Sequence, residues 1–168
     1  MNAMNKIISK EIFKKNRINT PKYFFLSDKD YSEKNLKKII RKKKFAFPVV
    51  VKPINEGSSI GVKICKNLKD LTVNSNKLIK KYEKLIFEKY IGGQEIQVAV
   101  MNREPLGAIE LKPKRNFYDY KAKYTKSAKT EHIMPANISE KKYKEVLSIA
   151  KKTHAIMNCR GVTRSDFK

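Results

Sequence analysis

The segment from Val49 to Ile64, VVVKPINEGSSIGVKI, places a lysine at the end of a valine run and a loop rich in glycine and serine directly after it. An ammonium group buried without a partner costs several kcal/mol, so Lys52 needs an anion or an opening to solvent. The glycines let the backbone come close to a ligand, and successive N–H groups with the hydroxyls of Ser58 and Ser59 can surround one anion. The segment indicates a phosphate site; the alternative is a hairpin that carries an exposed lysine.

A second segment, FEKYIGGQE, combines a strand-like run with a tight turn and an acidic residue. Residues Glu88 to Ile91 offer side-chain and backbone donors and acceptors in a row. After the Gly-Gly turn, Glu95 could accept hydrogen bonds from a ribose. The alternative for Glu95 is a solvated acidic residue beside a turn, so this segment alone is weak support for a binding site.

Length and composition favour a globular domain, or a large part of one, in a reducing compartment. The chain has 168 residues, of which 40% are hydrophobic, and no apolar run approaches the ~18–20 residues of a membrane span. The N-terminus has no uninterrupted apolar stretch of the kind found in secretory signals. Cys65 and Cys159 lie far apart with no metal-binding spacing, which argues against a disulfide framework or zinc site and favours the cytoplasm.

The net charge of +23 raises the possibility of nucleic-acid binding. The excess is scattered along the chain, and most of it is lysine, which is a poorer partner than arginine for bidentate recognition of phosphates or bases. We therefore keep a basic nucleic-acid-binding protein only as an alternative, and expect neither a specific nucleic-acid partner nor a membrane partner.

The hydrophobic pattern predicts an α+β fold whose second half is dominated by antiparallel strands. Helices are expected over residues 5–17, from Asp28 to near Lys44, from Asn67 to about Tyr82, and from Ser139 to about Asn158. Strands are expected at KYFFL (22–26), Phe47–Lys52, GVKIC (61–65), LIFEKY (85–90), EIQVAVM (95–101), PLGAIEL (105–111) and GVTRSDFK (161–168). The Phe47–Lys52 run is typical of a strand buried on both faces. Residues 117–130 lack a regular period and are predicted to form a long exposed loop.

Several of these motifs resemble those of one enzyme family. VVVKPINEGSSIGVKI, FEKYIGGQEIQVAV, FYDYKAKY, PANIS and CRGVTRSDF occur in the order and spacing of the D-alanine–D-alanine ligases of the ATP-grasp superfamily. The resemblance covers nearly the whole chain, and GSSIGV followed by YDYKAKY is its most specific part. It implies a partial ATP-grasp fold with helices on mixed or antiparallel sheets. A small subdomain would occupy about 20–92 and the start of a larger one about 93–168.

The resemblance implies a nucleotide site. Lys6 and Lys52 would contact the phosphates of ATP, and the loop with Ser58 and Ser59 would close over them. Glu95 would hold the ribose hydroxyls. The adenine pocket would be lined by Glu88, Lys89, Tyr90 and Ile91, with the backbone of that segment facing the base edge.

The resemblance also implies a reacting centre. Lys123 and Tyr124 would lie on a loop that folds over the γ-phosphate and the second substrate, and tyrosine at this position accompanies D-alanine as acceptor in the family. Arg164 would stabilise the transferred phosphoryl group and the later oxyanion, as an arginine can in a dry site. Asp166 would bind Mg²⁺, or in its place Mn²⁺.

The implied reaction activates the carboxylate of one D-alanine as an acyl phosphate, which the amine of a second D-alanine attacks, in the synthesis of peptidoglycan precursors. Full-length members are expected to be homodimers. Compared with the family, the sequence lacks an N-terminal domain and a segment after RSDF that completes a two-magnesium site. We therefore expect a fragment that does not complete the reaction alone. The alternatives are another ATP-grasp carboxylate–amine ligase or a nucleotide-binding fragment without activity.

Overall fold

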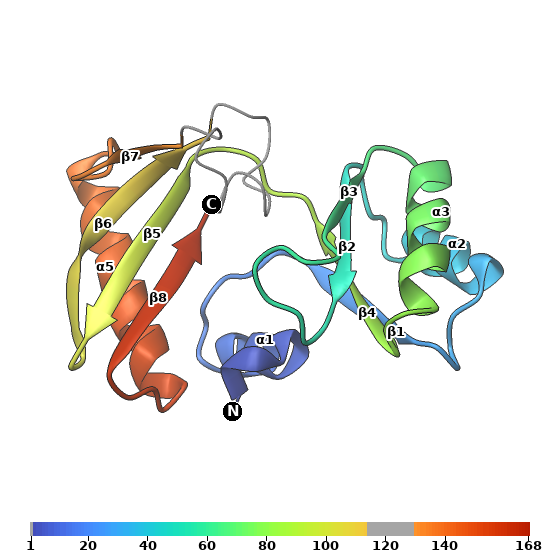
Figure 1. The fold of residues 1–168 in the computed structure, drawn as a ribbon, viewed down its shortest axis with the longest axis horizontal. Coiled ribbons are helices and arrows are strands. Elements are labelled where there is room, and N and C mark those ends of the chain that lie inside the picture. Colours follow the sequence, from blue (N-terminus) through green and yellow to red (C-terminus); the bar gives the residue numbers. More distant parts are fainter. Residues whose placement is uncertain (1, 114–129) are drawn as a thin grey trace. The chain divides into compact units, whose positions relative to one another are not determined.

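The computed structural model describes residues 2–113 and 130–168. Its chain divides into two compact units (Figure 1), one made of Met1–Lys10 and Thr20–Ile91 and the other of Glu11–Asn19 and Gly92–Lys168. Each unit contains a four-stranded sheet. Every pairing between described strands is antiparallel, so the α+β prediction is confirmed.

The first unit builds its sheet in the order β1-β4-β2-β3. Its strands are β1 (Tyr23–Ser27), β2 (Val49–Pro53), β3 (Lys63–Cys65) and β4 (Lys84–Lys89), and its helices are α2 (Glu33–Lys42) and α3 (Leu68–Ile79). A short 3-10 helix, η1 (Asn2–Met4), precedes α1 (Lys6–Lys15), whose first residues belong to this unit. Side chains of Ser32 and Asn67 accept hydrogen bonds at the starts of α2 and α3 and so cap them.

One face of the first sheet packs on α2 and α3. Phe24, Val51 and Phe87 point toward these helices, and the rings of Phe24 and Phe87 stack with their centroids 4.6 Å apart. In β2, residues 49, 51 and 53 are buried while 50 and 52 are half-buried. The prediction of a strand buried on both faces is therefore wrong for β2, because the helices cover a single face and leave the other for Lys52.

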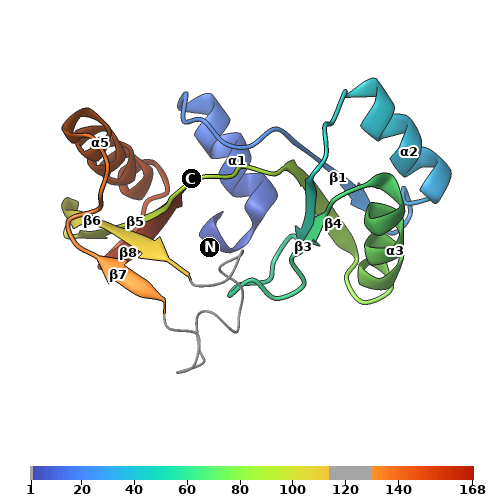
Figure 2. The ribbon, with the colours of Figure 1, turned by 90° about the horizontal axis from the view of Figure 1, so that it is seen from above.

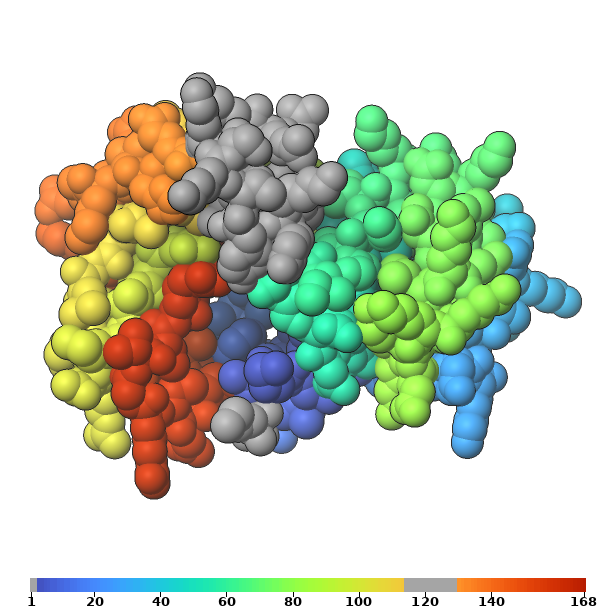
Figure 3. Space-filling view, viewed as in Figure 1, coloured from blue at the N-terminus to red at the C-terminus, as the bar shows by residue number. Residues whose placement is uncertain are grey.

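The second unit contains β5 (Glu95–Met101), β6 (Glu104–Lys112), β7 (Glu131–Ile133), α5 (Glu140–Ile156) and β8 (Val162–Phe167), with strand order β7-β6-β5-β8. Helix α5 lies on one face of the sheet (Figure 2). It packs there on Ile96, Val98 and Val100, as their alternation predicts. Strand β8, coloured red, lies at the surface in Figure 3, and its residues alternate between exposed and half-buried.

The structure adds two elements that the sequence did not predict, η1 and β7, each only three residues long. The final strand, β8, pairs with β5, which lies earlier in the chain. The predicted loop at 117–130 falls outside the described residues except for Thr130. Among the described helices, none has the length and apolar character needed to cross a membrane.

Candidate functional site

The face of the first sheet opposite α2 and α3 carries charged residues. Val50 lies directly opposite Glu88, and Lys52 lies opposite Ile86. Residues that face each other in neighbouring strands point to the same side of the sheet, so Lys52 and Glu88 share this side. Tyr23 of β1 joins them there, because it is the partner of Glu88 on the other edge of β4.

Four side chains on this face form a compact group that we call the Glu88 cluster: Lys6, Lys10, Lys52 and Glu88. The carboxylate of Glu88 is bound by two ammonium groups, Lys10 at 2.8 Å from Oε1 and Lys52 at 2.5 Å from Oε2. The side chains of Lys10 and Glu88 are each 8% exposed, whereas that of Lys52 is 22% exposed. Lys52 is thus the partner of Glu88 that solvent reaches.

Helix α1 supplies the other two lysines of the cluster. The Nζ atom of Lys6 donates to the carbonyl oxygens of Ile54, at 3.1 Å, and Glu56, both in the loop that follows β2. The Nζ atom of Lys10, one turn later, donates to the carbonyl oxygen of Pro21 at 3.2 Å. It also lies 4.9 Å from the centre of the Tyr23 ring, within the range of a cation–π contact. These contacts hold the two lysines against the sheet.

Burial and mutual repulsion tune the charges of the cluster. Burial, followed by the positive charge of Lys52, lowers the pKa of Lys6 to about 8. Burial also lowers the pKa of Lys10, against the opposing effect of Glu88. Burial alone would raise the pKa of Glu88, but Lys52 and Lys10 together outweigh it, and the pKa lies below its usual value. The cluster therefore holds one carboxylate among three amines and can accept further negative charge.

The loop between β2 and β3 contains an unusual turn. Ser58 and Ser59 have φ angles of 49° and 63°, in the left-handed region that residues other than glycine seldom adopt. The N–H of Ile60 donates to the carbonyl oxygen of Gly57 at 2.9 Å and closes the turn. Two consecutive left-handed residues are the pattern of a type I′ hairpin turn, which usually contains asparagine and glycine. Ser58 and Ser59 therefore adopt a backbone conformation that serine does not favour.

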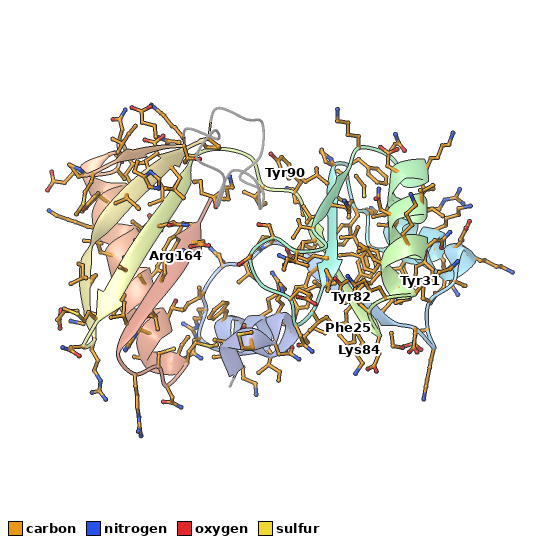
Figure 4. All side chains as sticks on the ribbon, in the orientation of Figure 1. Phe25, Tyr31, Tyr82, Lys84, Tyr90 and Arg164 are labelled. Atoms are coloured by element: carbon orange, nitrogen blue, oxygen red, sulfur yellow. The ribbon has the colours of Figure 1, made fainter. Side chains whose placement is uncertain are left out.

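The segment after Glu88 ends the strand. Lys89 is exposed, whereas Tyr90 and Ile91 are half-buried; Tyr90 is labelled just after β4 in Figure 4. The N–H groups of Lys89 and Tyr90 donate to the carbonyl oxygens of Lys22, at 2.9 Å, and Pro48, at 3.3 Å. Their backbone donors are therefore engaged within the first unit, and Glu88 itself points its carboxylate at lysines.

A second group of charges lies on the face of the second sheet opposite α5. Asp166 is the partner of Gln97, and Arg164 is the partner of Ala99. Glu95 is two residues before Gln97 in β5, so Glu95, Arg164 and Asp166 share this face. Arg164, labelled in Figure 4, binds Asp166 through two hydrogen bonds of 2.8 and 3.3 Å. The carboxylate of Glu95 lies 2.7 Å from the ammonium group of Lys168.

Asp166 is the predicted metal ligand, and the described residues give it little help. No group of three or more histidine, cysteine, aspartate or glutamate side chains in the described part of the chain could hold a metal ion. Asp166 is exposed and already paired with Arg164. Mg²⁺ is usually bound through one or two carboxylates together with phosphates and waters, so this donor set by itself does not fit a magnesium site.

The predicted site residues thus fall into two groups within their own units. Lys6, Lys52 and Glu88 meet in the first unit, and Glu95, Arg164 and Asp166 share one sheet face in the second. Ser58 and Ser59 lie in the turn after β2. Lys123 and Tyr124 lie outside the described residues. Sequence reasoning missed Lys10; its signal was the four-residue spacing from Lys6, which places both lysines on one side of a helix.

Comparison with known proteins adds a family context to this geometry. The family described as D-ala D-ala ligase C-terminus matches residues 12–168. The D-alanine–D-alanine ligase of Pelagibacter ubique is 51% identical over 166 residues, which are 99% of this chain and 53% of that protein. The enzyme of the same name from Wolbachia pipientis wMel is 43% identical over 99% of this chain and 50% of its own. The chain therefore spans about half the length of the curated relatives that it matches.

Solved structures agree with the fold. The D-alanine–D-alanine ligase of Bacillus anthracis superimposes with a TM-score of 0.78 at 29% identity, over 98% of this chain and 52% of that one. The VanG D-Ala:D-Ser ligase of Enterococcus faecalis gives a TM-score of 0.81 over 98% of this chain and 48% of that one. At 24% identity, the second similarity speaks for the fold alone.

Proposed function

Because the chain belongs to the D-alanine–D-alanine ligase family, we propose that its first unit binds the phosphates of ATP within a protein that joins two D-alanines. In this proposal the residues at about 20–92 and about 93–168 are two subdomains of an ATP-grasp region. The chain spans about half the length of its relatives, so the complete reaction is assigned to the longer protein and nucleotide binding to this part of it.

One observation carries the proposal: the Glu88 cluster contains three amines and a single carboxylate. Lys52 is the more exposed of the two lysines that bind Glu88, with 22% of its side chain exposed. Burial and the charge of Lys52 lower the pKa of Lys6. A polyphosphate would offset this excess of positive charge. A partly buried site strengthens such an interaction, because the effective dielectric constant is lower than in water.

The described residues support a division of roles. Lys52 would exchange Glu88 for a phosphate oxygen, and Lys6 would add a second charge from α1. The turn at Ser58 and Ser59 would bring N–H groups and hydroxyls to the same phosphates. Phosphoryl transfer depends mainly on such positioning and charge neutralisation.

The roles proposed for the second unit use the face opposite α5. Arg164 would stabilise charge on the transferred phosphoryl group and on the oxyanion that forms when the amine attacks. Glu95 would accept hydrogen bonds from the ribose hydroxyls after release from Lys168. Lys123 and Tyr124 would cover the reacting groups and exclude water, which would otherwise hydrolyse the acyl phosphate.

Magnesium would neutralise phosphate charge in the family reaction. Asp166 is exposed and paired with Arg164, and it would need further donors before it could hold the metal. Binding of nucleotide to the lysines of the first unit is therefore the part of the reaction assigned to the described residues.

The second substrate and the location are part of the same proposal. D-Alanine is proposed as the acceptor, since the family match and the 51% identical relative carry that name. A related fold serves a D-Ala:D-Ser ligase in VanG, so the fold does not by itself select the acceptor. Use of ATP and the presence of two free cysteines favour the cytoplasm, and dimerisation is proposed only by analogy with the family.

Calorimetric titration with ADP tests the proposal. We expect one ADP per chain at about 0.3 M salt, a level that weakens loose phosphate contacts. Replacement of Lys52 by methionine should lower the affinity at least tenfold, because a half-buried cation is lost. Lys84→Met is the matched control, since Lys84 is an exposed lysine at the other end of β4 and should leave binding unchanged (Figure 4). Equal binding by both variants would contradict the proposal.

A further inference from the structure

Lys10 is one of the three amines of the Glu88 cluster, but no contact with the nucleotide is proposed for it. It is the more deeply buried of the two lysines that bind Glu88. We propose that Lys10 is a positioning residue for nucleotide binding: it holds Glu88 through Oε1, so that Oε2 can release Lys52 to a phosphate. This inference rests on the proposed nucleotide function of the first unit. It identifies a residue that would control nucleotide affinity without contacting the nucleotide.

Lys10 is placed to hold Glu88 and is poorly placed to bind a ligand. Its side chain is 8% exposed, and its ammonium group contacts the Glu88 carboxylate, the Pro21 carbonyl and the face of the Tyr23 ring. A phosphate would have to displace these contacts to reach it. Lys10 therefore acts through Glu88.

The two oxygens of Glu88 are divided between two lysines. Oε1 belongs to Lys10 and Oε2 to Lys52. A carboxylate that is 8% exposed needs a cation, because removing one partner of a buried pair leaves an uncompensated charge. With Lys10 in place, Glu88 keeps a counterion when Lys52 moves to a phosphate. Without Lys10, Lys52 is the ion-pair partner left to Glu88 among the described residues, and it is harder to release.

A purely structural role for Lys10 makes a different prediction. A buried ion pair that only stabilises the fold would change the free energy of unfolding when it is removed, without changing how Lys52 responds to a phosphate. If Lys10 instead controls the release of Lys52, its effect on binding requires the negative charge of Glu88. Removing that charge should then abolish the effect of Lys10.

Four proteins form the test: the unaltered 168-residue chain, Lys10→Met, Glu88→Gln and the double variant. ADP affinity is measured by calorimetry, and thermal unfolding confirms that each protein is folded. We expect Lys10→Met to weaken ADP binding roughly tenfold, the size of effect that a buried charge partner can exert. The double variant should bind ADP within about twofold of Glu88→Gln, because Lys52 is then free in both.

Lys14→Met is the control for loss of a lysine from α1, since Lys14 lies on the same helix and is exposed; it should bind like the unaltered chain. If Lys10→Met does not fold, Lys10→Gln replaces it in the cycle, since the amide keeps a hydrogen-bond donor for Glu88 while removing the charge.

Two results would overturn the inference alone: unchanged ADP binding by the Lys10 variant while Lys52→Met loses it, or an equal loss on replacing Lys10 with and without the Glu88 charge. Failure of the unaltered chain to bind ADP would instead overturn the proposed function, and the role of Lys10 with it.

Discussion

Glu88 is the residue around which the chemistry of the first unit is organised. Its carboxylate is almost fully buried and is shared by Lys10 and Lys52. From the sequence, Glu88 was assigned to an adenine pocket and Lys52 to phosphate, with no link between them. The link depends on the register of β2 and β4, because Lys52 and Glu88 are far apart in sequence and meet only when these strands pair.

Other charged residues predicted for the site are also bound to oppositely charged side chains. Arg164 binds Asp166, and Glu95 binds Lys168. The Arg164–Asp166 pair is largely exposed, and exposed ion pairs contribute little to stability. A nucleotide phosphate or a cation can therefore replace either partner at small cost. Arg164 and Asp166 are two residues apart in β8 and so lie on the same face of the strand, but this spacing does not reveal that they bind each other.

We expect Lys6 to make the proposed nucleotide binding depend on pH. Its pKa is lowered to about 8 by burial and by Lys52, and a bound phosphate favours the protonated amine. The free protein loses this proton as the pH rises through about 8, so ADP affinity should fall by up to about tenfold per unit above that pH. Phosphate groups are already ionised there, since their second pKa is about 6, and do not add to the change.

The pH dependence is measured by titrating ADP between about pH 7 and about pH 9.5 in two buffers of different ionisation enthalpy. The unaltered chain should take up protons on binding above about pH 8, in line with the lowered pKa of Lys6. Lys6→Met should bind more weakly near neutral pH and show a flatter profile. An unaltered chain whose affinity is constant across this range would contradict the role given to Lys6.

At the scale of elements, the turn after β2 must hold its shape beside Lys52. Gly61 has a φ of 71°, and a Cβ there would lie 2.7 Å from Cγ and 2.8 Å from Cδ of Pro53. The proline ring cannot move aside as a flexible side chain could. Gly61→Ala should therefore lower the free energy of unfolding by about 2 kcal/mol or more, through both backbone strain and overlap, and should weaken ADP binding by shifting the loop.

Gly57 provides the matched control in the same loop. A Cβ at Gly57 meets nothing within 4 Å, so Gly57→Ala should change the free energy of unfolding by less than about 0.5 kcal/mol. Chemical denaturation of both variants makes the comparison. Equal stability of the two alanine variants would show that the close approach of Gly61 to Pro53 does not constrain the loop.

Sequence patterns predicted most of the helices and strands because the periods of apolar residues were clear. Ile96, Val98 and Val100 alternate along β5 and point toward α5, and Asn67 and Ser139 cap α3 and α5. The short elements η1 and β7 were missed, since three residues carry no period. The partner of β8 was also missed, because strand pairing between distant segments is set by the tertiary fold rather than by local sequence.

At the scale of the whole molecule, the large number of lysines makes the lysines of the proposed site hard to identify from the sequence. The sequence contains 39 Lys and Arg residues, and most of its lysines are solvated. What sets Lys6, Lys10 and Lys52 apart is burial around one carboxylate, which composition cannot reveal. The family match covers residues 12–168 and so includes Lys52 and Glu88 but begins after Lys6 and Lys10. The curated relatives align over 99% of the chain, and the structure shows that the start of α1 contacts the matched region through Lys6 and Lys10.

The net positive charge of the chain offers a second explanation for any affinity toward nucleotides, which is binding at many surface lysines. A basic surface binds phosphates at many places, and such binding falls steeply with salt. A defined site in the first unit involves particular lysines and saturates with one ADP. The two cases differ in which lysines the ligand contacts. A measurement that identifies the contacted residues therefore separates them better than a measurement of affinity.

The most direct measurement is NMR of the lysine side-chain amines during titration with ADP at about 0.3 M salt, with signals assigned from single lysine variants. We expect large shifts for Lys6 and Lys52 that saturate together at one ADP per chain, and no shift for Lys84. Small, unsaturated shifts spread over the exposed lysines, with Lys6 and Lys52 no different from the rest, would contradict the proposed site.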